Sequence, residues 1–167
     1  MESLKIGLLG AGTVGTQVAR IIQDEAEDLQ QRVGCKLEIT GVGVRDLSKD
    51  RPGIEKALLT TDLESVVDGA DLVVEVMGGI DPTEALLRRA LTQGSSVVTA
   101  NKALLGERLI ELSELADENN ADLYFEAAVA GAIPIMRPLR ESLVGDEVSS
   151  VIGIVNGTTN YILDKMV

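Results

Sequence analysis

The chain has 167 residues, the length of one domain or of one domain with the beginning of another. Hydrophobic residues make up 45% and aromatic residues only 2%, so the core must consist of aliphatic side chains, as in buried parallel strands and their covering helices. A net charge of −12 disfavours nucleic acid as a partner, and the absence of histidine beside a single cysteine, Cys35, excludes disulfides, the usual zinc sites and His-based triads within the chain.

A glycine-rich turn follows the first predicted strand, residues 5–9. Gly10 permits a tight turn, Gly12 lets the main chain approach a pyrophosphate, and Gly15 lets the next helix press against its strand. Amide groups at the start of that helix would point towards the phosphates. An ordinary glycine turn is the alternative, but the strand before and the helix after favour a nucleotide cofactor.

Strands and helices then alternate along the chain. The first helix ends at Gly34, and its predicted inward face consists of Val14, Val18, Ile21, Ile22 and Leu29. Further strands are predicted at residues 37–44, 72–76, 97–100 and 123–127. The helices between them are predicted to run from residues 61–64 to Gly69, from Asp81 to Gly94, and over residues 107–119 with Leu109, Ile110, Leu112 and Leu115 inward. This alternation predicts a Rossmann-type α/β fold, a doubly wound parallel sheet with its ligand at the carboxyl ends of the strands.

The pattern changes after about residue 129. Residues 135–143 are predicted as a helix, residues 148–155 as a strand, and residues 161–163 as a further helical turn behind the Asn- and Thr-rich residues 156–160. We therefore divide the chain into a Rossmann domain, residues 1–132, and the beginning of a second α+β region, residues 133–167. Because the last element ends before it can pack, we expect the chain to be a fragment.

Arg45 ends the second strand, where a Rossmann fold meets the adenosine ribose. An acidic residue there would bind a 2′-hydroxyl, whereas an arginine pairs with a 2′-phosphate, so Arg45 favours NADP. Asp46 beside it leaves NAD open. A surface ion pair of Arg45 is the alternative.

Two further charged residues each have two interpretations. Lys102 follows the strand at residues 97–100 and faces the same crevice as residues 77–79, where it either meets the nicotinamide ribose, a substrate or a proton, or is a solvated surface lysine. Glu126 lies among small apolar residues, where its carboxylate either gathers a cation with carbonyl oxygens or accepts backbone hydrogen bonds. Residues 156–160 either supply groups to a polar ligand or, more commonly for such residues, cap a helix.

Five segments together resemble homoserine dehydrogenase, in the order and at the spacing of its N-terminal part. They are residues 7–15, 75–79, 98–102, 125–134 and 156–163. The resemblance implies NAD(P)-dependent interconversion of L-homoserine and L-aspartate 4-semialdehyde by hydride transfer, on the pathway to threonine, methionine and isoleucine. It also implies that residues 133–167 begin a substrate-binding and dimerisation region, and that the intact enzyme is a homodimer.

The resemblance assigns roles to the matching residues of this chain. The implied cofactor contacts are Gly10, Gly12, Thr13, Val14, Gly15, Arg45, Gly78, Thr99 and Lys102. The implied sodium ligands are the carbonyls of Glu126, Val129, Gly131 and Ile133, and the implied edge of the substrate pocket is Gly157 and Thr158. Lys102 would be an auxiliary catalytic residue, because the family's principal acid/base lysine falls after residues 156–163. We therefore expect cofactor binding without most of the catalytic apparatus.

Two other functions compete with this interpretation. A stand-alone NAD(P)-sensing Rossmann module explains the short chain but gives no reason for residues 156–163. The second is another amino-acid or semialdehyde dehydrogenase of similar architecture. A thiohemiacetal mechanism would require a cysteine nucleophile in a loop, whereas Cys35 precedes the second strand. We expect a cytoplasmic protein, because the sequence shows no signal-peptide pattern and no apolar run approaching the ~20 residues that span a bilayer.

Overall fold

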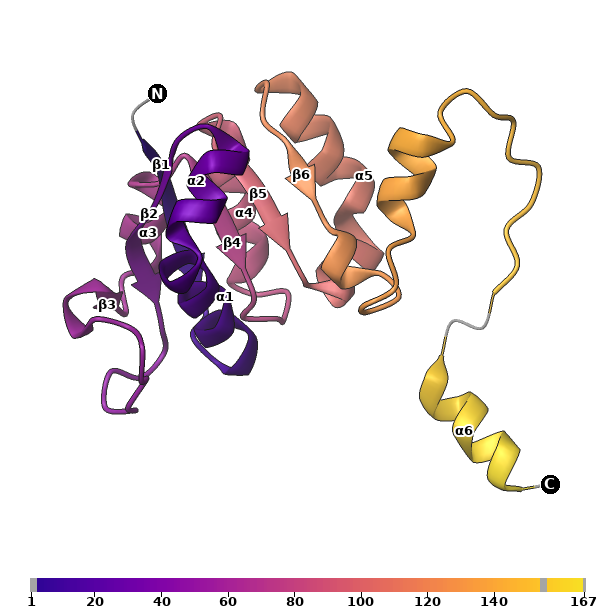
Figure 1. The fold of residues 1–167 in the computed structure, drawn as a ribbon, viewed down its shortest axis with the longest axis horizontal. Coiled ribbons are helices and arrows are strands. Elements are labelled where there is room, and N and C mark those ends of the chain that lie inside the picture. Colours follow the sequence, from indigo (N-terminus) through magenta and orange to yellow (C-terminus); the bar gives the residue numbers. More distant parts are fainter. Residues whose placement is uncertain (1–2, 154–155, 167) are drawn as a thin grey trace.

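A computed structural model describes residues 3–153 and 156–166. Its centre is a sheet of parallel strands in the order β3-β2-β1-β4-β5-β6, the order of a Rossmann fold (Figure 1). The strands are β1 (Ser3–Leu9), β2 (Lys36–Gly43), β3 (Leu59–Thr60), β4 (Leu72–Glu75), β5 (Ser96–Thr99) and β6 (Leu123–Tyr124). The predicted fold class is therefore confirmed.

Helices lie on both sides of the sheet (Figure 1). On one side are α1 (Thr13–Asp24) and α2 (Ala26–Val33), and on the other are α3 (Leu63–Asp68), α4 (Thr83–Thr92) and α5 (Lys102–Glu118). Because successive strand residues point to opposite faces, Leu8 and Val74 join the core beneath α1, whereas Leu9 and Val73 join the core beneath α3, α4 and α5. Within the described residues, none of these helices combines the length and the apolar character needed to cross a membrane.

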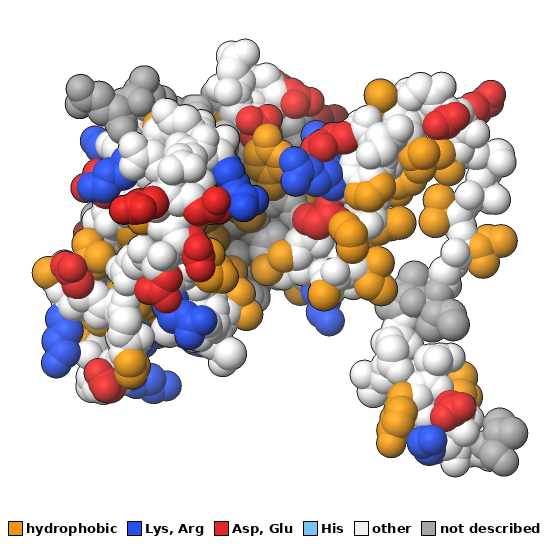
Figure 2. Space-filling model, viewed as in Figure 1, with side chains coloured by type: hydrophobic (Ala, Val, Ile, Leu, Met, Phe, Trp, Pro, Cys, Tyr) orange, Lys and Arg blue, Asp and Glu red, His pale blue; other side chains and the backbone are white. Residues whose placement is uncertain are grey.

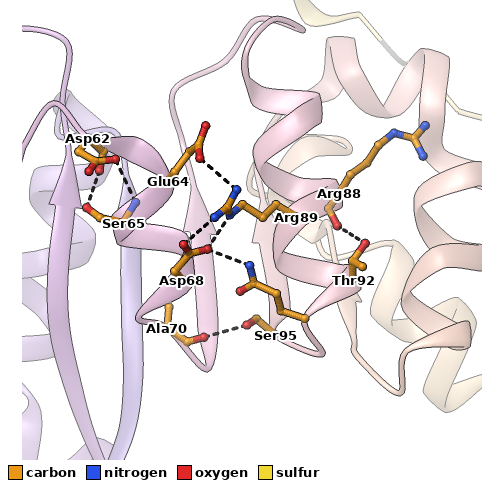
Figure 3. A network of polar contacts seen from close by, with 10 residues as sticks. Asp62, Glu64, Ser65, Asp68, Ala70, Arg88, Arg89, Thr92 and Ser95 are labelled. Atoms are coloured by element: carbon orange, nitrogen blue, oxygen red, sulfur yellow. Dashed lines mark hydrogen bonds and ion pairs between the residues drawn. The ribbon is translucent and has the colours of Figure 1, made fainter.

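Ion pairs join the helices of the second side (Figure 3). The Arg89 guanidinium on α4 makes two bonds to the Asp68 carboxylate on α3, of 2.6 and 2.7 Å, and a third to Glu64 at 3.0 Å. Gln93 also donates to Asp68, at 2.8 Å. These hydrogen bonds lower the pKa of Asp68 from 3.8 to about 2, and the bonds from Arg89 have the largest effect.

The first helix differs from its prediction in two ways. It is interrupted at Glu25, so that α1 and α2 are separate helices, although Gly34 ends α2 with the positive φ of 84° expected of a stop. Val14 and Ile21, predicted to face inward, are 57% and 50% exposed. Small residues, Gly15 and Ala19, are buried in their place, because α1 starts too close to the glycine turn for large side chains to fit beneath it.

The helix predicted at residues 107–119 begins earlier, at Lys102. Its start is fixed by Asn101, whose side-chain oxygen accepts the Leu104 N–H at 3.1 Å, a capping signal that apolar periodicity does not reveal. Ile110, predicted to face inward, is 74% exposed. The strand predicted at residues 123–127 is only two residues long, because residues 126–128 form the short 3-10 helix η2 (Glu126–Ala128).

Beyond residue 129 the chain has no strand among its described residues. The strand predicted at residues 148–155 is not formed over residues 148–153, where no neighbouring strand offers hydrogen-bonding partners, and residues 154–155 lie outside the described part. Within the helix predicted at residues 135–143, the structure has a short π-helix, η3 (Pro138–Ser142). Helix α6 (Gly157–Lys165) lies apart from the sheet, and Figure 2 shows hydrophobic side chains exposed along this region.

Candidate cofactor site

The turn between β1 and α1 requires its glycines. Gly10 has a φ of 104°, a left-handed conformation that disfavours other residues. A Cβ on Gly15 would lie 2.0 Å from the Gly10 carbonyl oxygen, so only glycine lets the helix begin here. A Cβ on Gly12, by contrast, would meet nothing within 4 Å. The backbone at Gly12 therefore faces open space into which a bound group can enter.

The N-terminus of α1 presents unused hydrogen-bond donors. The backbone N–H groups of Thr13, Val14 and Gly15 donate to no acceptor within the described residues, and Gly12, the N-cap, contributes no side chain. No acidic residue lies in the first helical turn. Free N–H groups and the positive end of the helix dipole together form a site suited to an anion such as a diphosphate.

A cavity of about 240 Å³ opens beside this helix terminus at the carboxyl ends of the strands. Its lining brings together Gly10, Ala11, Gly12, Gly43, Val44, Arg45, Asp46, Lys49, Arg51, Val76 and Met77. Of the four loops expected to converge at the carboxyl ends of the strands, three meet in this cavity: the glycine turn, the loop that begins at Arg45 and the loop after β4. The residues that follow Thr99 do not line this cavity, although they also leave the sheet at its carboxyl edge.

Arg45 has two basic neighbours that sequence reasoning did not identify. Lys49 and Arg51 line the same cavity, and the Arg51 guanidinium reaches across to donate to the Ala11 carbonyl at 3.3 Å. The signal was present as three basic residues within seven positions after the second strand. No ion pair of Arg45 occurs among the described residues, so the alternative of a surface pair finds no support.

Asp46, which left NAD open, is engaged locally. Its Oδ1 accepts hydrogen bonds from the hydroxyl and the backbone N–H of Ser48, at 2.6 and 2.9 Å. These two bonds lower the pKa of Asp46, and the bond from the hydroxyl has the larger effect. The carboxylate thereby stabilises the turn that leads to Lys49 and Arg51.

The loops after β4 and β5 carry Gly78, Thr99 and Lys102. Gly78 and Gly79 both have positive φ, 71° and 79°, and form a tight turn. Thr99 is fully buried and its hydroxyl donates to Glu75, so this side chain is engaged within the protein. Lys102 is exposed at the first position of α5 and forms no ion pair within the described residues.

Glu126 uses its carboxylate to hold the backbone. Its oxygens accept hydrogen bonds from the N–H groups of Ile135, Met136 and Arg137, at 2.7, 3.1 and 2.8 Å. Burial raises the pKa of Glu126, but these three bonds outweigh burial and the pKa lies below its ordinary value. The interpretation that the carboxylate accepts backbone hydrogen bonds is thus confirmed, and no cluster of three or more His, Cys, Asp or Glu residues suited to a metal ion occurs in the described part of the chain.

Gly157 and Thr158 lie far from the glycine turn. They begin α6, and Asn156 caps that helix through its side-chain oxygen, which accepts the Thr159 N–H at 2.9 Å. Capping is therefore the observed role of the Asn- and Thr-rich segment. Because α6 stands apart from the sheet, the structure does not bring Gly157 and Thr158 to the cofactor cavity (Figure 1).

Comparison with known proteins identifies the family. The family model described as "Homoserine dehydrogenase, NAD binding domain" matches residues 10–126, well over half of the chain. The chain belongs to the homoserine dehydrogenase family. A second family model, described as "Homoserine dehydrogenase", matches residues 134–167. The first of these two matches includes both the glycine turn and the segment that ends at Glu126.

Individual relatives and solved structures that are similar to this chain are also homoserine dehydrogenases. The protein of that name from Corynebacterium glutamicum is 52% identical over 167 residues, covering 99% of this chain and 38% of that protein. The crystal structure of a homoserine dehydrogenase from Thiobacillus denitrificans has a TM-score of 0.91 at 39% identity, over 99% of this chain and 39% of that one. A hyperthermophilic archaeal homoserine dehydrogenase in complex with NADPH has a TM-score of 0.80 at 28% identity, over 98% of this chain and 56% of that one. The chain thus spans about two fifths of the length of the curated relatives it matches.

Proposed function

We propose that this chain is the NADP(H)-binding part of a cytoplasmic enzyme that interconverts L-homoserine and L-aspartate 4-semialdehyde, on the pathway to threonine, methionine and isoleucine. The observation that carries the proposal is one cavity lined by residues 10–12, Arg45, Lys49 and Arg51. It lies beside the N-terminus of α1, where the first N–H groups of the helix are unused. Free amides suit a diphosphate, and three cations beside them suit the additional 2′-phosphate that distinguishes NADP from NAD. The archaeal homoserine dehydrogenase of similar fold is in complex with NADPH, which supports this choice.

The residues of this chain would bind and orient the two halves of the cofactor. Gly10, Gly12, Thr13, Val14 and Gly15 would hold the diphosphate, and Arg45 the 2′-phosphate. Gly78, Thr99 and Lys102 would lie at the nicotinamide half, where the bound cofactor supplies the group that accepts or donates a hydride. Lys102 is an exposed ammonium at the start of α5, where it would orient a polar substrate as an auxiliary to the principal acid/base residue.

A sodium site in the loop after η2 fits the donors that the structure offers. The carbonyls of Val129, Gly131 and Ile133 accept no hydrogen bond from the described residues, while that of Glu126 accepts one from the Val129 N–H at 3.2 Å. Carbonyl oxygens are suitable ligands for a hard cation. We propose that these four carbonyls hold sodium. The ion would fix the loop between the two regions of the chain.

We further propose that the Rossmann domain ends at residue 132. Residues 133–167 would then begin the substrate-binding and dimerisation region of a homodimer, with Gly157 and Thr158 at the edge of the substrate pocket. The exposed apolar residues of this region, among them Val151, Ile152 and Tyr161, are the surface that such an assembly would cover.

The test is an assay of NADP-dependent oxidation of L-homoserine, followed by NADPH absorbance, on this 167-residue chain and on a protein in which the remaining part of a homoserine dehydrogenase is fused to it. We expect turnover from the fusion and none from the chain alone. Turnover by the chain alone would show that its own residues suffice for catalysis. A fusion that binds NADPH but does not oxidise homoserine would contradict the proposed substrate.

A further inference from the structure

Among the described residues, Glu75 is the only charged side chain that is buried, and it is fully buried. It ends β4, directly before the Met77-Gly78-Gly79 turn. No ion pair of Glu75 occurs within the described residues. Burying a carboxylate is costly unless hydrogen bonds compensate, so its donors indicate what it is there to hold.

Those donors belong to the two loops at the carboxyl edge of the sheet. Glu75 Oε1 accepts the backbone N–H groups of Met77 and Gly78, at 2.8 and 2.9 Å. Its Oε2 accepts the Thr99 hydroxyl at 2.5 Å. One carboxylate therefore connects the loop after β4 with the end of β5.

The network continues from Thr99 to the start of α5. Thr99 Oγ1 accepts the backbone N–H of Asn101 at 3.0 Å, and the Asn101 side-chain nitrogen donates to the Gly79 carbonyl at 2.5 Å. The Met77-Gly78-Gly79 turn is thus held from both ends, by Glu75 and by Asn101. Since two of its three residues are glycines with positive φ, this turn has little conformational preference of its own.

We propose that Glu75 is a positioning residue for the nicotinamide half of the cofactor site. It fixes the backbone of residues 77–79 and, through Thr99 and Asn101, the start of α5 where Lys102 lies. The inference rests on the proposed cofactor function. Its distinctive consequence is a division between the cofactor's halves. Met77 borders both this network and the cavity. The glycine turn, which would hold the diphosphate, and Arg45, which would hold the 2′-phosphate, make no hydrogen bond to the network.

The test compares Glu75→Gln with the wild-type chain, using calorimetric titration with NADPH and with 2′,5′-ADP, which carries the adenosine half and its 2′-phosphate. A glutamine has one oxygen and one NH2 group, so one or two donors of the network lose their acceptor, depending on its orientation. We expect the dissociation constant of NADPH to rise about tenfold or more, which corresponds to the loss of one or two hydrogen bonds to a charged group. That of 2′,5′-ADP should stay within about twofold.

Ser95→Ala is the matched control. Ser95 is also buried and donates to the Ala70 carbonyl at 2.8 Å, but it joins β4 and β5 at their opposite, amino-terminal ends (Figure 3). It should lower the melting temperature and leave both dissociation constants unchanged. Asn101→Ser is a second variant in case Glu75→Gln does not fold, since serine can still cap α5 but is too short to reach Gly79. It should weaken NADPH selectively as well.

Equal weakening of both ligands by Glu75→Gln, or no weakening of either, would overturn the assignment and leave Glu75 with a general structural role. If the wild-type chain binds 2′,5′-ADP but not NADPH, the adenosine site stands and the positioning role of Glu75 fails. If the wild-type chain binds neither ligand, the proposed cofactor function fails first and this inference with it.

Discussion

Gly15 packs so closely on Gly10 that a Cβ at position 15 would lie 2.0 Å from the Gly10 carbonyl oxygen. The obstructing atom belongs to the backbone of the turn and cannot rotate away. Gly15→Ala should therefore lower the free energy of unfolding by about 1–3 kcal/mol, the usual cost of overpacking, or by more. Urea denaturation measures this change. A variant as stable as the wild type would show that the turn is less tightly packed than the structure describes.

Gly12→Ala should have the opposite profile. Its Cβ would meet no atom within 4 Å, and its φ of −84° suits alanine, so stability should remain within about 0.5 kcal/mol of the wild type. The new methyl group would occupy the space through which the diphosphate approaches α1. We expect NADPH affinity to fall about tenfold or more in a calorimetric titration. Unchanged affinity would place the diphosphate elsewhere.

Arg45→Ala tests the choice between the two cofactors. A charge-assisted hydrogen bond contributes about 1.5–3 kcal/mol, so loss of the Arg45 contact should weaken NADPH by about ten- to a hundredfold. Affinity for NADH, which lacks the 2′-phosphate, should change little. Arg20→Ala, an exposed arginine on α1 paired with Asp24, is the matched control and should affect neither ligand. Equal weakening of NADPH and NADH by Arg45→Ala would argue that Arg45 contacts a group common to both.

The sequence predicted the parts of the site that are determined by residues close together in the chain. The glycine turn depends on backbone conformation, and Arg45 stands at a strand end that any parallel sheet places beside the turn. Lys49 and Arg51 could not be assigned, because only the folded path of the loop after β2 brings them to the cavity, where Arg51 donates to the Ala11 carbonyl. The same holds for Glu75, whose role depends on partners 24 positions away at Thr99.

Titration of Asp68 should make the stability of the folded chain depend on pH in the acidic range. Its pKa is lowered from 3.8 to about 2, chiefly by Arg89, so its stabilising contribution is complete above pH 3.8 and is lost as the pH falls through about 2. Asp68→Asn should melt below the wild type at pH 7, and this difference should shrink between about pH 4 and pH 2. Glu118→Gln is the control, because Glu118 is exposed and forms no ion pair in the described chain. Its melting temperature should differ little from that of the wild type throughout this pH range. A constant gap for Asp68→Asn across this range would exclude the titration of Asp68 as its cause.

Glu126→Gln tests what the Glu126 carboxylate holds. The three backbone N–H groups of residues 135–137 donate to its two oxygens, and glutamine has only one oxygen to offer them. Hydrogen exchange of these amides should accelerate about tenfold, as expected when about 1.4 kcal/mol of protection is lost. Amides of β4, which lie outside this loop, serve as the internal reference. Unchanged exchange at residues 135–137 would mean that other contacts fix this segment.

Elements that depend on a partner were predicted least well. Residues 148–153 contain three β-branched apolar residues, Val148, Val151 and Ile152, yet no strand forms there because no neighbouring strand supplies hydrogen bonds. The start of α5 was missed for a different reason, since it is fixed by one capping side chain, Asn101, and not by apolar periodicity. Buried strands such as β4, whose apolar runs are continuous, were located to within a residue.

The central claim is that this chain binds a phosphorylated nicotinamide dinucleotide at the N-terminus of α1. Calorimetric titration of the 167-residue chain with NADPH and with NADH tests it most directly. The cavity lined by Arg45, Lys49 and Arg51 predicts one binding site per chain and NADPH affinity at least about tenfold above that of NADH. Absence of binding by both nucleotides, or a clear preference for NADH, would contradict the account.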